Sequence, residues 1–165
     1  MAERVMVQVG IGEFRASKNP SEVLIAYGLG SCVGVCIYDP EARVGGLAHV
    51  MLPSSAEAVS QRPLGKFADC AVPMLLEEIA KLGGHQHRWL AKIAGGAQML
   101  VGPGFCNNGF NIGERNVQAV KTALGALGVP LVRAETGGNK GRTIALHLAT
   151  GTVTVRTVGE KEIEL

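Results

Sequence analysis

The feature that most constrains the fold is a succession of short apolar runs, rich in β-branched residues and separated by glycine-containing turns. Runs of this kind predict strands. We expect strands over residues 5–9, 22–27, 32–38, 44–52, 92–94, 130–135, 143–149 and 152–158. Because consecutive strands are usually neighbours, we expect residues 22–52 to form adjacent strands of one sheet. Strands in runs, with few helices between them, favour an α+β fold over a doubly wound parallel sheet.

Two segments have the apolar spacing of amphipathic helices. The first covers residues 66–82, and Pro73 inside it predicts a kink or a later helix start. The second covers residues 112–127, with Asn111 suited to its N-cap and Gly128 to its C-terminal end. The sequence therefore predicts two helices beside a larger number of strands.

The composition indicates one ordered cytoplasmic domain. The 165 residues are 47% apolar and 18% charged, which argues against disorder, and we expect residues 1–165 to form a single domain. The formal net charge of +2 gives no electrostatic reason to expect nucleic acid or a membrane surface as partner. No apolar run reaches the ~18 residues of a membrane span, and the first ten residues lack the apolar stretch of a secretory signal.

The most informative stretch for chemistry is GLGSCVGVCIYDPEARVGGLAHVMLP, residues 28–53. It places Cys32 directly after a Gly-x-Gly turn and His49 on a later expected strand. A thiol nucleophile needs a base within hydrogen-bond reach, free backbone amides for an oxyanion and an open approach. Cys32 and His49 supply the nucleophile and the base, and the glycines Gly28, Gly30 and Gly34 allow close approach.

Other interpretations of these residues are open. Cysteines in apolar runs are commonly small core residues, and we expect this of Cys36, Cys70 and Cys106. A G-x-C-x-G match at residues 30–34 resembles a nucleophile elbow, but that motif needs a helix after the nucleophile, whereas a strand is expected. A metal site built on Cys32, Cys36 and His49 is disfavoured, because the two thiols lie ~13 Å apart along a strand.

The remaining histidines have simpler interpretations. His85 and His87 lie in the polar turn GGHQHR and are expected to be solvated. His147 alternates with apolar neighbours on an expected strand, and the sequence indicates no role for it. Because the cytosol is a reducing compartment, we expect the four cysteines to be free thiols. Their spacings contain no C-x-x-C, which excludes a zinc ribbon and a thioredoxin-type motif.

The runs GLGSCVGVCIYDP and VGGLAHVMLP resemble the signature of the CheD family of chemoreceptor glutamine deamidases. Further similar motifs follow in order: KFAD (66–69), KIAGGAQM (92–99), NIGERN (111–116) and ETGGNKGR (135–142). This signature and the four further motifs, in the same order, are far more specific than any one of them, and the resemblance spans about residues 8 to 158.

The resemblance implies a fold, an activity and partners. The fold is a three-layer α/β/β sandwich with mixed sheets. The activity is hydrolysis of glutamine side-chain amides in methyl-accepting chemotaxis receptors, giving glutamate and ammonia through a thioester on Cys32, with His49 as base. No metal or organic cofactor is required, and some members also bind a CheC-type phosphatase. Two other functions stay open: a catalytically weak binding partner of such a phosphatase, and a receptor methylesterase using the same dyad.

The expected mechanism and substrate also assign roles to residues around Cys32 and His49. Backbone amides near Gly30, Ser31 and Cys32 are expected to bind the oxyanion, and the clusters 95–96 and 136–139 are candidates for the substrate rim, ordinary tight turns being the alternative.

One position departs from the family pattern. The resemblance places at residue 26 a threonine that orients the histidine, and this chain has Ala26. A backbone carbonyl, a water or another hydroxyl must then orient His49, and Thr136 is the candidate hydroxyl.

Overall fold

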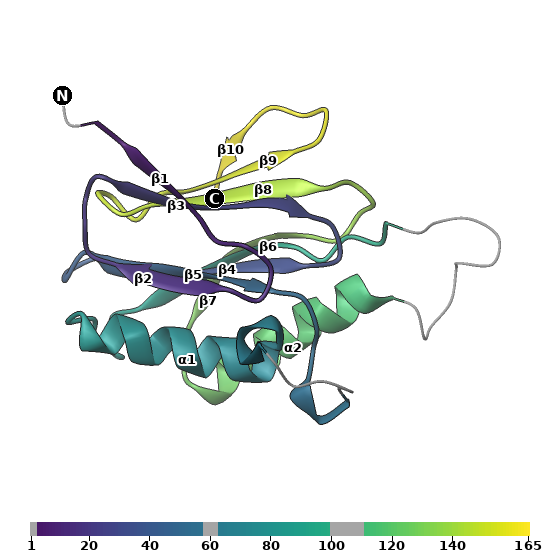
Figure 1. Ribbon diagram of the computed structural model, residues 1–165, viewed down its shortest axis with the longest axis horizontal. Helices are drawn as coiled ribbons and strands as arrows, with labels where there is room; N and C mark the ends of the chain where they lie inside the picture. Colours follow the sequence, from purple (N-terminus) through teal and green to yellow (C-terminus); the bar gives the residue numbers. More distant parts are fainter. Residues whose placement is uncertain (1–2, 58–62, 100–110) are drawn as a thin grey trace.

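The chain is arranged in three layers, which the computed structural model describes for residues 3–57, 63–99 and 111–165. Two helices cover one face of a central sheet, and a second sheet packs on the opposite face (Figure 1). The elements in chain order are β1 (Val5–Gln8), β2 (Phe14–Ser17), β3 (Glu22–Leu29), β4 (Val33–Asp39), β5 (Val44–Val50), the short 3₁₀ turns η1 (Ser55–Glu57) and η2 (Leu64–Lys66), α1 (Ala68–Lys81), β6 (Leu90–Gly95), α2 (Ile112–Ala126), β7 (Leu131–Thr136), β8 (Arg142–His147), β9 (Val153–Thr157) and β10 (Ile163–Glu164).

Both sheets are mixed. The outer sheet has the strand order β1-β3-β8-β9-β10, in which β1 and β3 are parallel and the other neighbours antiparallel. The central sheet has the order β2-β5-β4-β6-β7, in which only β6 and β7 are parallel. The expectation of an α+β sandwich with an α/β/β order of layers is confirmed.

The central sheet is apolar on both faces because both are covered. Every residue of β4 and β5 is buried. Alternate side chains of β4, such as Val33 and Val35, pack under the helices, whereas Cys36 and Tyr38 pack against the outer sheet. A strand covered on both faces is a nearly continuous apolar run, which explains why these two segments lack polar alternation.

The strands within residues 22–52 do not belong to one sheet, so that expectation was wrong. Strand β3 pairs with β1 and β8 in the outer sheet, and β4 and β5 pair in the central sheet. The chain therefore crosses from one sheet to the other between Leu29 and Val33. Sequence adjacency predicts pairing only when the connection is a hairpin, and here residues 30–32 lead into the facing sheet.

The remaining strand boundaries differ from expectation in small ways. Strand β4 begins at Val33, so Cys32 lies just before it, and β5 ends at Val50. The short strands β2 and β10 were not expected, because neither has an apolar run of its own.

The two expected helices are present. Helix α1 begins at Ala68, two residues later than expected, and continues through Pro73. The Asn111 side chain caps α2 by accepting the N–H of Glu114 at 3.2 Å, and Gly128 follows the helix with a φ of +69°. Among the described residues, neither helix has the length and apolarity needed to traverse a bilayer.

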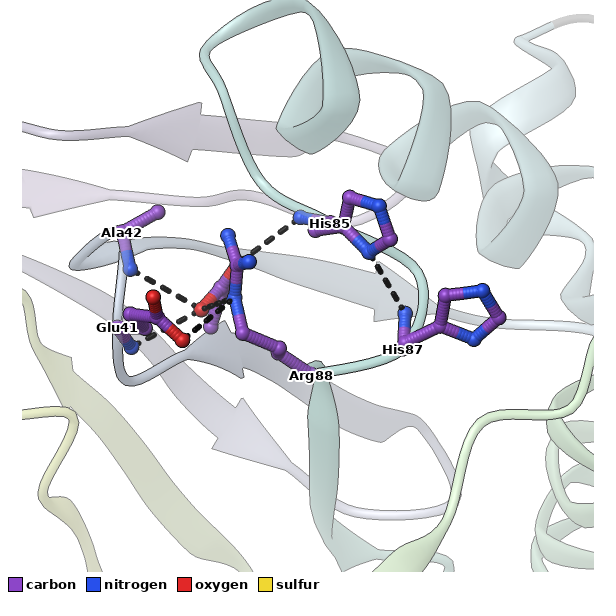
Figure 2. A network of polar contacts seen from close by, with 6 residues as sticks. Glu41, Ala42, His85, His87 and Arg88 are labelled. Carbon is purple, nitrogen blue, oxygen red and sulfur yellow. Dashed lines mark hydrogen bonds and ion pairs between the residues drawn. The ribbon is translucent and has the colours of Figure 1, made fainter.

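The turn between β4 and β5 is fixed by Asp39, whose side chain is fully buried. Its carboxylate accepts the backbone N–H groups of Glu41 (3.0 Å), Ala42 (3.1 Å) and His85 (2.8 Å) and the Nε of Arg88 (3.0 and 3.1 Å). Figure 2 shows Arg88, His85 and Ala42 converging on this carboxylate from two loops. The loop between α1 and β6 is thereby tied to the hairpin that carries His49.

The electrostatics of this network favour the charged carboxylate. Burial by itself raises the pKa of Asp39, but hydrogen bonds from Arg88 and from three backbone N–H groups outweigh it and lower the pKa to about 2. A carboxyl whose pKa is depressed on folding stabilises the protein above its unfolded pKa, and this contribution is lost as the pH falls through the folded value. The contribution is therefore fully present at neutral pH.

We expect Asp39→Ala to lower the free energy of unfolding by roughly 3–5 kcal/mol, because a buried charge network loses its acceptor. Urea unfolding at neutral pH measures the effect. Glu41→Ala is the matched control. Its side chain is exposed and lies 3.5 Å from Arg88, so its loss should cost less than about 1 kcal/mol. Equal losses in the two variants would contradict the role given to Asp39.

Candidate active site

The connection between the two sheets, residues 30–32, is held rigidly by hydrogen bonds to its carbonyl groups. The Gly30 carbonyl accepts the N–H of Ala97 at 2.8 Å, and the Cys32 carbonyl accepts the N–H of Gly96 at 2.8 Å. Both donors follow β6, the neighbour of β4 in the central sheet. The segment that carries Cys32 is thus fixed against the end of β6.

The glycines after β6 are required by close packing. A Cβ at Gly95 would lie 2.2 Å from the Cys32 carbonyl oxygen, and a Cβ at Gly96 would lie 2.3 Å from a methyl of Val117. Both glycines have positive φ, 115° and 65°, which side chains rarely adopt. Because glycine has no Cβ and tolerates positive φ, the backbone at Gly95 and Gly96 can pack closely against both Cys32 and α2.

A buried amide supports this connection from the helix layer. The Nδ2 of Asn116, on α2, donates to the carbonyl of Ser31 and to that of Met51, each at 2.9 Å. Asn116 is fully buried. Sequence reasoning missed it as a functional residue. Its signal was a polar residue on the apolar stripe of the helix, in line with Val120 and Leu124.

The amide N–H groups of this segment have no internal acceptor. Within the described residues, neither the Ser31 N–H nor the Cys32 N–H donates to a backbone or side-chain acceptor. Consecutive backbone N–H groups without partners, beside a nucleophile, are the donors from which an oxyanion site is built. These two N–H groups lie in the segment expected to bind the oxyanion, and that role stays a prediction.

Cys32 and His49 face the same layer. His49 pairs with Gly34 across β4 and β5, and Cys32 lies two residues before Gly34. Leu47, two residues before His49, packs in the core between the sheets together with Cys32. By strand alternation the imidazole also points into that layer. The two side chains are thus on one face of the central sheet, as the dyad requires.

The His49 ring is oriented by a backbone carbonyl. Nδ1 lies 3.1 Å from the carbonyl oxygen of Val9, and Nε2 is buried with no hydrogen-bond partner among the described residues. A neutral ring that donates Nδ1–H to Val9 carries its lone pair on Nε2, the form a general base needs. The His49 backbone is held too, through the N–H of Gly12 and the carbonyl of Glu13, each at 3.0 Å.

Burial keeps this pair uncharged at rest. Cys32 is 8% exposed and His49 is 2% exposed. Burial raises the pKa of the Cys32 thiol. Burial also lowers the pKa of His49, and this outweighs the opposing effects of the Val9 hydrogen bond and the Glu13 charge. Both shifts favour the neutral thiol of Cys32 and the neutral imidazole of His49 over their charged forms.

Ala26 and Thr136 are the two residues expected to bear on the orientation of His49. Ala26 is fully buried in the core between the sheets, the layer that contains Cys32, and Tyr27 is exposed on the other side of β3, as expected. Thr136 was the wrong candidate for orienting His49. The Val9 carbonyl bonds the ring at Nδ1, and Nε2 has no partner in the described part of the chain. Thr136 pairs with Gly95 at the end of β7.

The glycine clusters expected at the rim meet near Cys32. The Gly137 N–H donates to the Gly95 carbonyl at 3.1 Å, and the Gly138 carbonyl accepts the Gln98 N–H at 2.8 Å. Arg142, which is buried, donates to the carbonyls of Gly95 and Gly137 at 3.2 and 2.8 Å. These loops form one hydrogen-bonded unit beside the segment that carries Cys32.

The other expected thiols and histidines lie away from this arrangement. Cys36 is buried in the core, its pKa raised by burial, and Cys70 is half-buried on α1. Cys106 lies outside the described residues. His85 and His87 are exposed, as expected.

Two further expectations concern Gly34 and metal binding. Gly34 does not provide an open approach, because a Cβ there would lie 2.5 Å from a methyl of Ile144 in the outer sheet. In the described ranges, no three histidine, cysteine or acidic side chains gather as metal ligands.

Comparison with known proteins gives a consistent result. The family model for CheD, described as chemotactic sensory transduction, matches residues 51–157. Chemoreceptor glutamine deamidase CheD of Thermotoga maritima is 49% identical over 154 residues, 93% of this chain and 93% of that protein. Probable chemoreceptor glutamine deamidases CheD of Desulforamulus reducens and Symbiobacterium thermophilum are similar as well. The first is 46% identical over 93% of this chain and 91% of its own length, and the second is 43% identical over 100% of both.

The motifs, the three-layer fold and these similarities agree. The family model covers more than half of the chain, and the relatives span nearly all of it. This chain therefore belongs to the CheD family.

Proposed function

We propose that this protein is a chemoreceptor glutamine deamidase, a protein-glutamine glutaminase in which Cys32 is the nucleophile and His49 the general base. Its substrates are glutamine side chains of methyl-accepting chemotaxis receptors, and its products are glutamate and ammonia. The proposal treats residues 1–165 as one cytoplasmic deamidase domain. The names of the similar proteins support the receptor substrate.

One observation carries the catalytic part of the proposal. The face of the central sheet that holds the Cys32 thiol also holds His49, whose Nε2 has no hydrogen-bond partner among the described residues. Within the same residues, the N–H groups of Ser31 and Cys32 have no acceptor either. Nucleophile, base and oxyanion donors are the three parts that acyl transfer from an amide needs.

The first half of the reaction transfers the acyl group to sulfur. As the Cys32 Sγ attacks the glutamine Cδ, its proton moves to Nε2 of His49. The tetrahedral intermediate carries its negative charge on the former carbonyl oxygen, which accepts hydrogen bonds from the Ser31 and Cys32 N–H groups. The His49 imidazolium then gives its proton to the departing nitrogen, the C–N bond breaks, and ammonia leaves a thioester on Cys32.

The second half returns the enzyme to its starting state. His49, neutral again, takes a proton from water as the water oxygen attacks the thioester carbon. The second tetrahedral intermediate collapses, the C–S bond breaks, and the proton on His49 returns to the Cys32 sulfur. The product is a glutamate side chain. The acid formed loses its proton to solvent. The other proton transfers run between Cys32, His49, water and the departing nitrogen, so the proposed cycle needs no metal or organic cofactor.

A CheC-type phosphatase is a second partner in this proposal, and it rests on the family resemblance alone. Co-purification of the two proteins, with and without receptor fragment, tests it. Failure to bind would remove this partner and leave the enzymatic part of the proposal intact.

We expect Cys32→Ala to lose more than roughly a thousandfold of the turnover number, because no other group can form the thioester. Ammonia release from receptor, with peptide mass spectrometry of its glutamines, measures the effect and separates deamidation from removal of methyl esters. Cys70→Ala, at a half-buried thiol on α1, is the matched control and should keep wild-type turnover. Near-normal ammonia release by Cys32→Ala would refute the mechanism.

The pH profile tests the protonation states. His49 works only when neutral, and its pKa is lowered from the ordinary 6.5 by burial. Activity should therefore fall only when the pH drops below the ordinary histidine range. In the proposed cycle, the proton that His49 gives to the departing nitrogen comes from the Cys32 thiol, so activity should fall once this thiol is deprotonated at rest. Burial raises the pKa of the thiol, and this loss of activity should therefore begin above the ordinary cysteine value of 9.0. An acid limb of kcat/KM at or above pH 6.5 would contradict this assignment.

Restoring a hydroxyl at residue 26 tests how His49 is oriented. Because the Val9 carbonyl already holds Nδ1, Ala26→Thr should not raise the turnover number. Residue 26 is fully buried, so the larger side chain should lower the free energy of unfolding by roughly 1–3 kcal/mol. Steady-state kinetics and urea unfolding measure the two effects. A turnover number increased tenfold or more would show that the carbonyl orients the ring incompletely, since one positioned group contributes roughly a hundredfold or more.

A further inference from the structure

The side chain of Asn116 is a buried polar group that the catalytic cycle does not use directly. It is fully buried on α2, and its Nδ2 is shared between the carbonyls of Ser31 and Met51. Its Oδ1 is also buried and has no hydrogen-bond partner among the described residues. An amide buried with half of its hydrogen-bonding capacity unused costs stability. The residue is therefore best explained by what its two N–H bonds achieve.

The bond to Ser31 fixes the direction of the Cys32 N–H. A peptide unit is planar and trans, so its C=O and N–H point in opposite directions. Because the Ser31 carbonyl points toward Asn116 and α2, the Cys32 N–H of the same peptide points away from α2. That N–H is one of the two unpartnered donors beside the thiol.

Nothing else in the described chain holds this peptide by hydrogen bonds. The carbonyls of Gly30 and Cys32 are held by Ala97 and Gly96, but they belong to the neighbouring peptide units. The plane between Ser31 and Cys32 can turn by opposite changes of the two flanking dihedral angles, leaving those units in place. The amide of Asn116 opposes this rotation.

The second bond of Asn116 joins the two halves of the dyad. Met51 follows His49 by two residues, immediately beyond the end of β5. One NH₂ group thus links the backbone before the nucleophile to the backbone after the base. It does so from the helix side of the central sheet, whereas the thiol and the imidazole point to the other side.

We propose that Asn116 is a positioning residue that keeps the Ser31–Cys32 peptide turned so that the Cys32 N–H is presented to the oxyanion. The inference deepens the proposed deamidase function and rests on it. Asn116 does not touch the substrate. Without it the peptide samples orientations in which the oxyanion has one donor fewer, while the thiol keeps its place.

This role predicts a separation between catalysis and thiol reactivity. Alkylation of a thiol by iodoacetamide forms no oxyanion, whereas attack on an amide does. Asn116→Asp, which is nearly the same size and replaces the two N–H donors by oxygen, should lower kcat for receptor deamidation by roughly ten- to a hundredfold. This lies below the 10²–10³-fold typical of removing an oxyanion donor entirely. KM and the rate of Cys32 alkylation, followed by peptide mapping, should stay near wild-type values.

Two further variants make the experiment decisive. Asn111→Asp adds the same charge to the same helix at its N-cap, where aspartate is equally suitable, and should keep wild-type kcat. Asn116→Ala removes the donors without adding a charge. It replaces Asn116→Asp if circular dichroism shows that variant to be unfolded, and it should give the same separation of kcat from alkylation.

The outcomes separate the inference from the function on which it rests. Wild-type protein that releases no ammonia from receptor would overturn both. With an active wild type, unchanged kcat in both Asn116 variants would overturn the inference alone. A parallel loss of kcat and alkylation rate would overturn it too, because Asn116 would then support the thiol itself and have no specific role in orienting the peptide.

Discussion

The arrangement depends above all on how the chain crosses from the outer sheet to the central sheet. Three consecutive carbonyls, of Gly30, Ser31 and Cys32, accept hydrogen bonds from two different elements at 2.8 to 2.9 Å. Fixing the carbonyls fixes the opposite ends of the same peptide units, and these are the N–H groups. The short connection that carries Cys32 is thereby held at three successive carbonyls, and in the proposed mechanism its N–H groups bind the oxyanion.

Burial favours the uncharged forms of the Cys32 thiol and the His49 imidazole. A thiol and an imidazole placed between two apolar sheets lose hydration, and desolvation disfavours the charged form of each. Packing between the two sheets therefore favours a neutral thiol and a neutral imidazole, and the proposed mechanism accordingly moves the thiol proton during the attack. The orientation of His49 is set in the same layer, because Nδ1 of the buried ring donates to the carbonyl of Val9.

The support for the site comes from distant parts of the sequence. The helix layer contributes Asn116, the loop after β6 contributes Gly95 and Gly96, and the end of β1 contributes Val9. Asn116 and the two glycines contribute through their residue types, whereas Val9 contributes a backbone carbonyl. A carbonyl leaves no trace in residue type, which is why the group that orients His49 could be anticipated only as a class, and Thr136 was proposed in its place.

The sequence by itself determined the class of fold, the two helices with the Asn111 cap, and the pairing of Cys32 with His49 as candidates. Apolar periodicity, capping residues and a thiol within a glycine turn are local signals, and each is written in neighbouring residues. Only the tertiary structure decided that β3 lies in a different sheet from β4 and β5, and that Asn116 reaches the backbone carbonyl of Ser31, next to Cys32. Strand partners and the direction of a buried carbonyl depend on contacts between residues far apart in the chain, and such contacts exist only once the layers have packed.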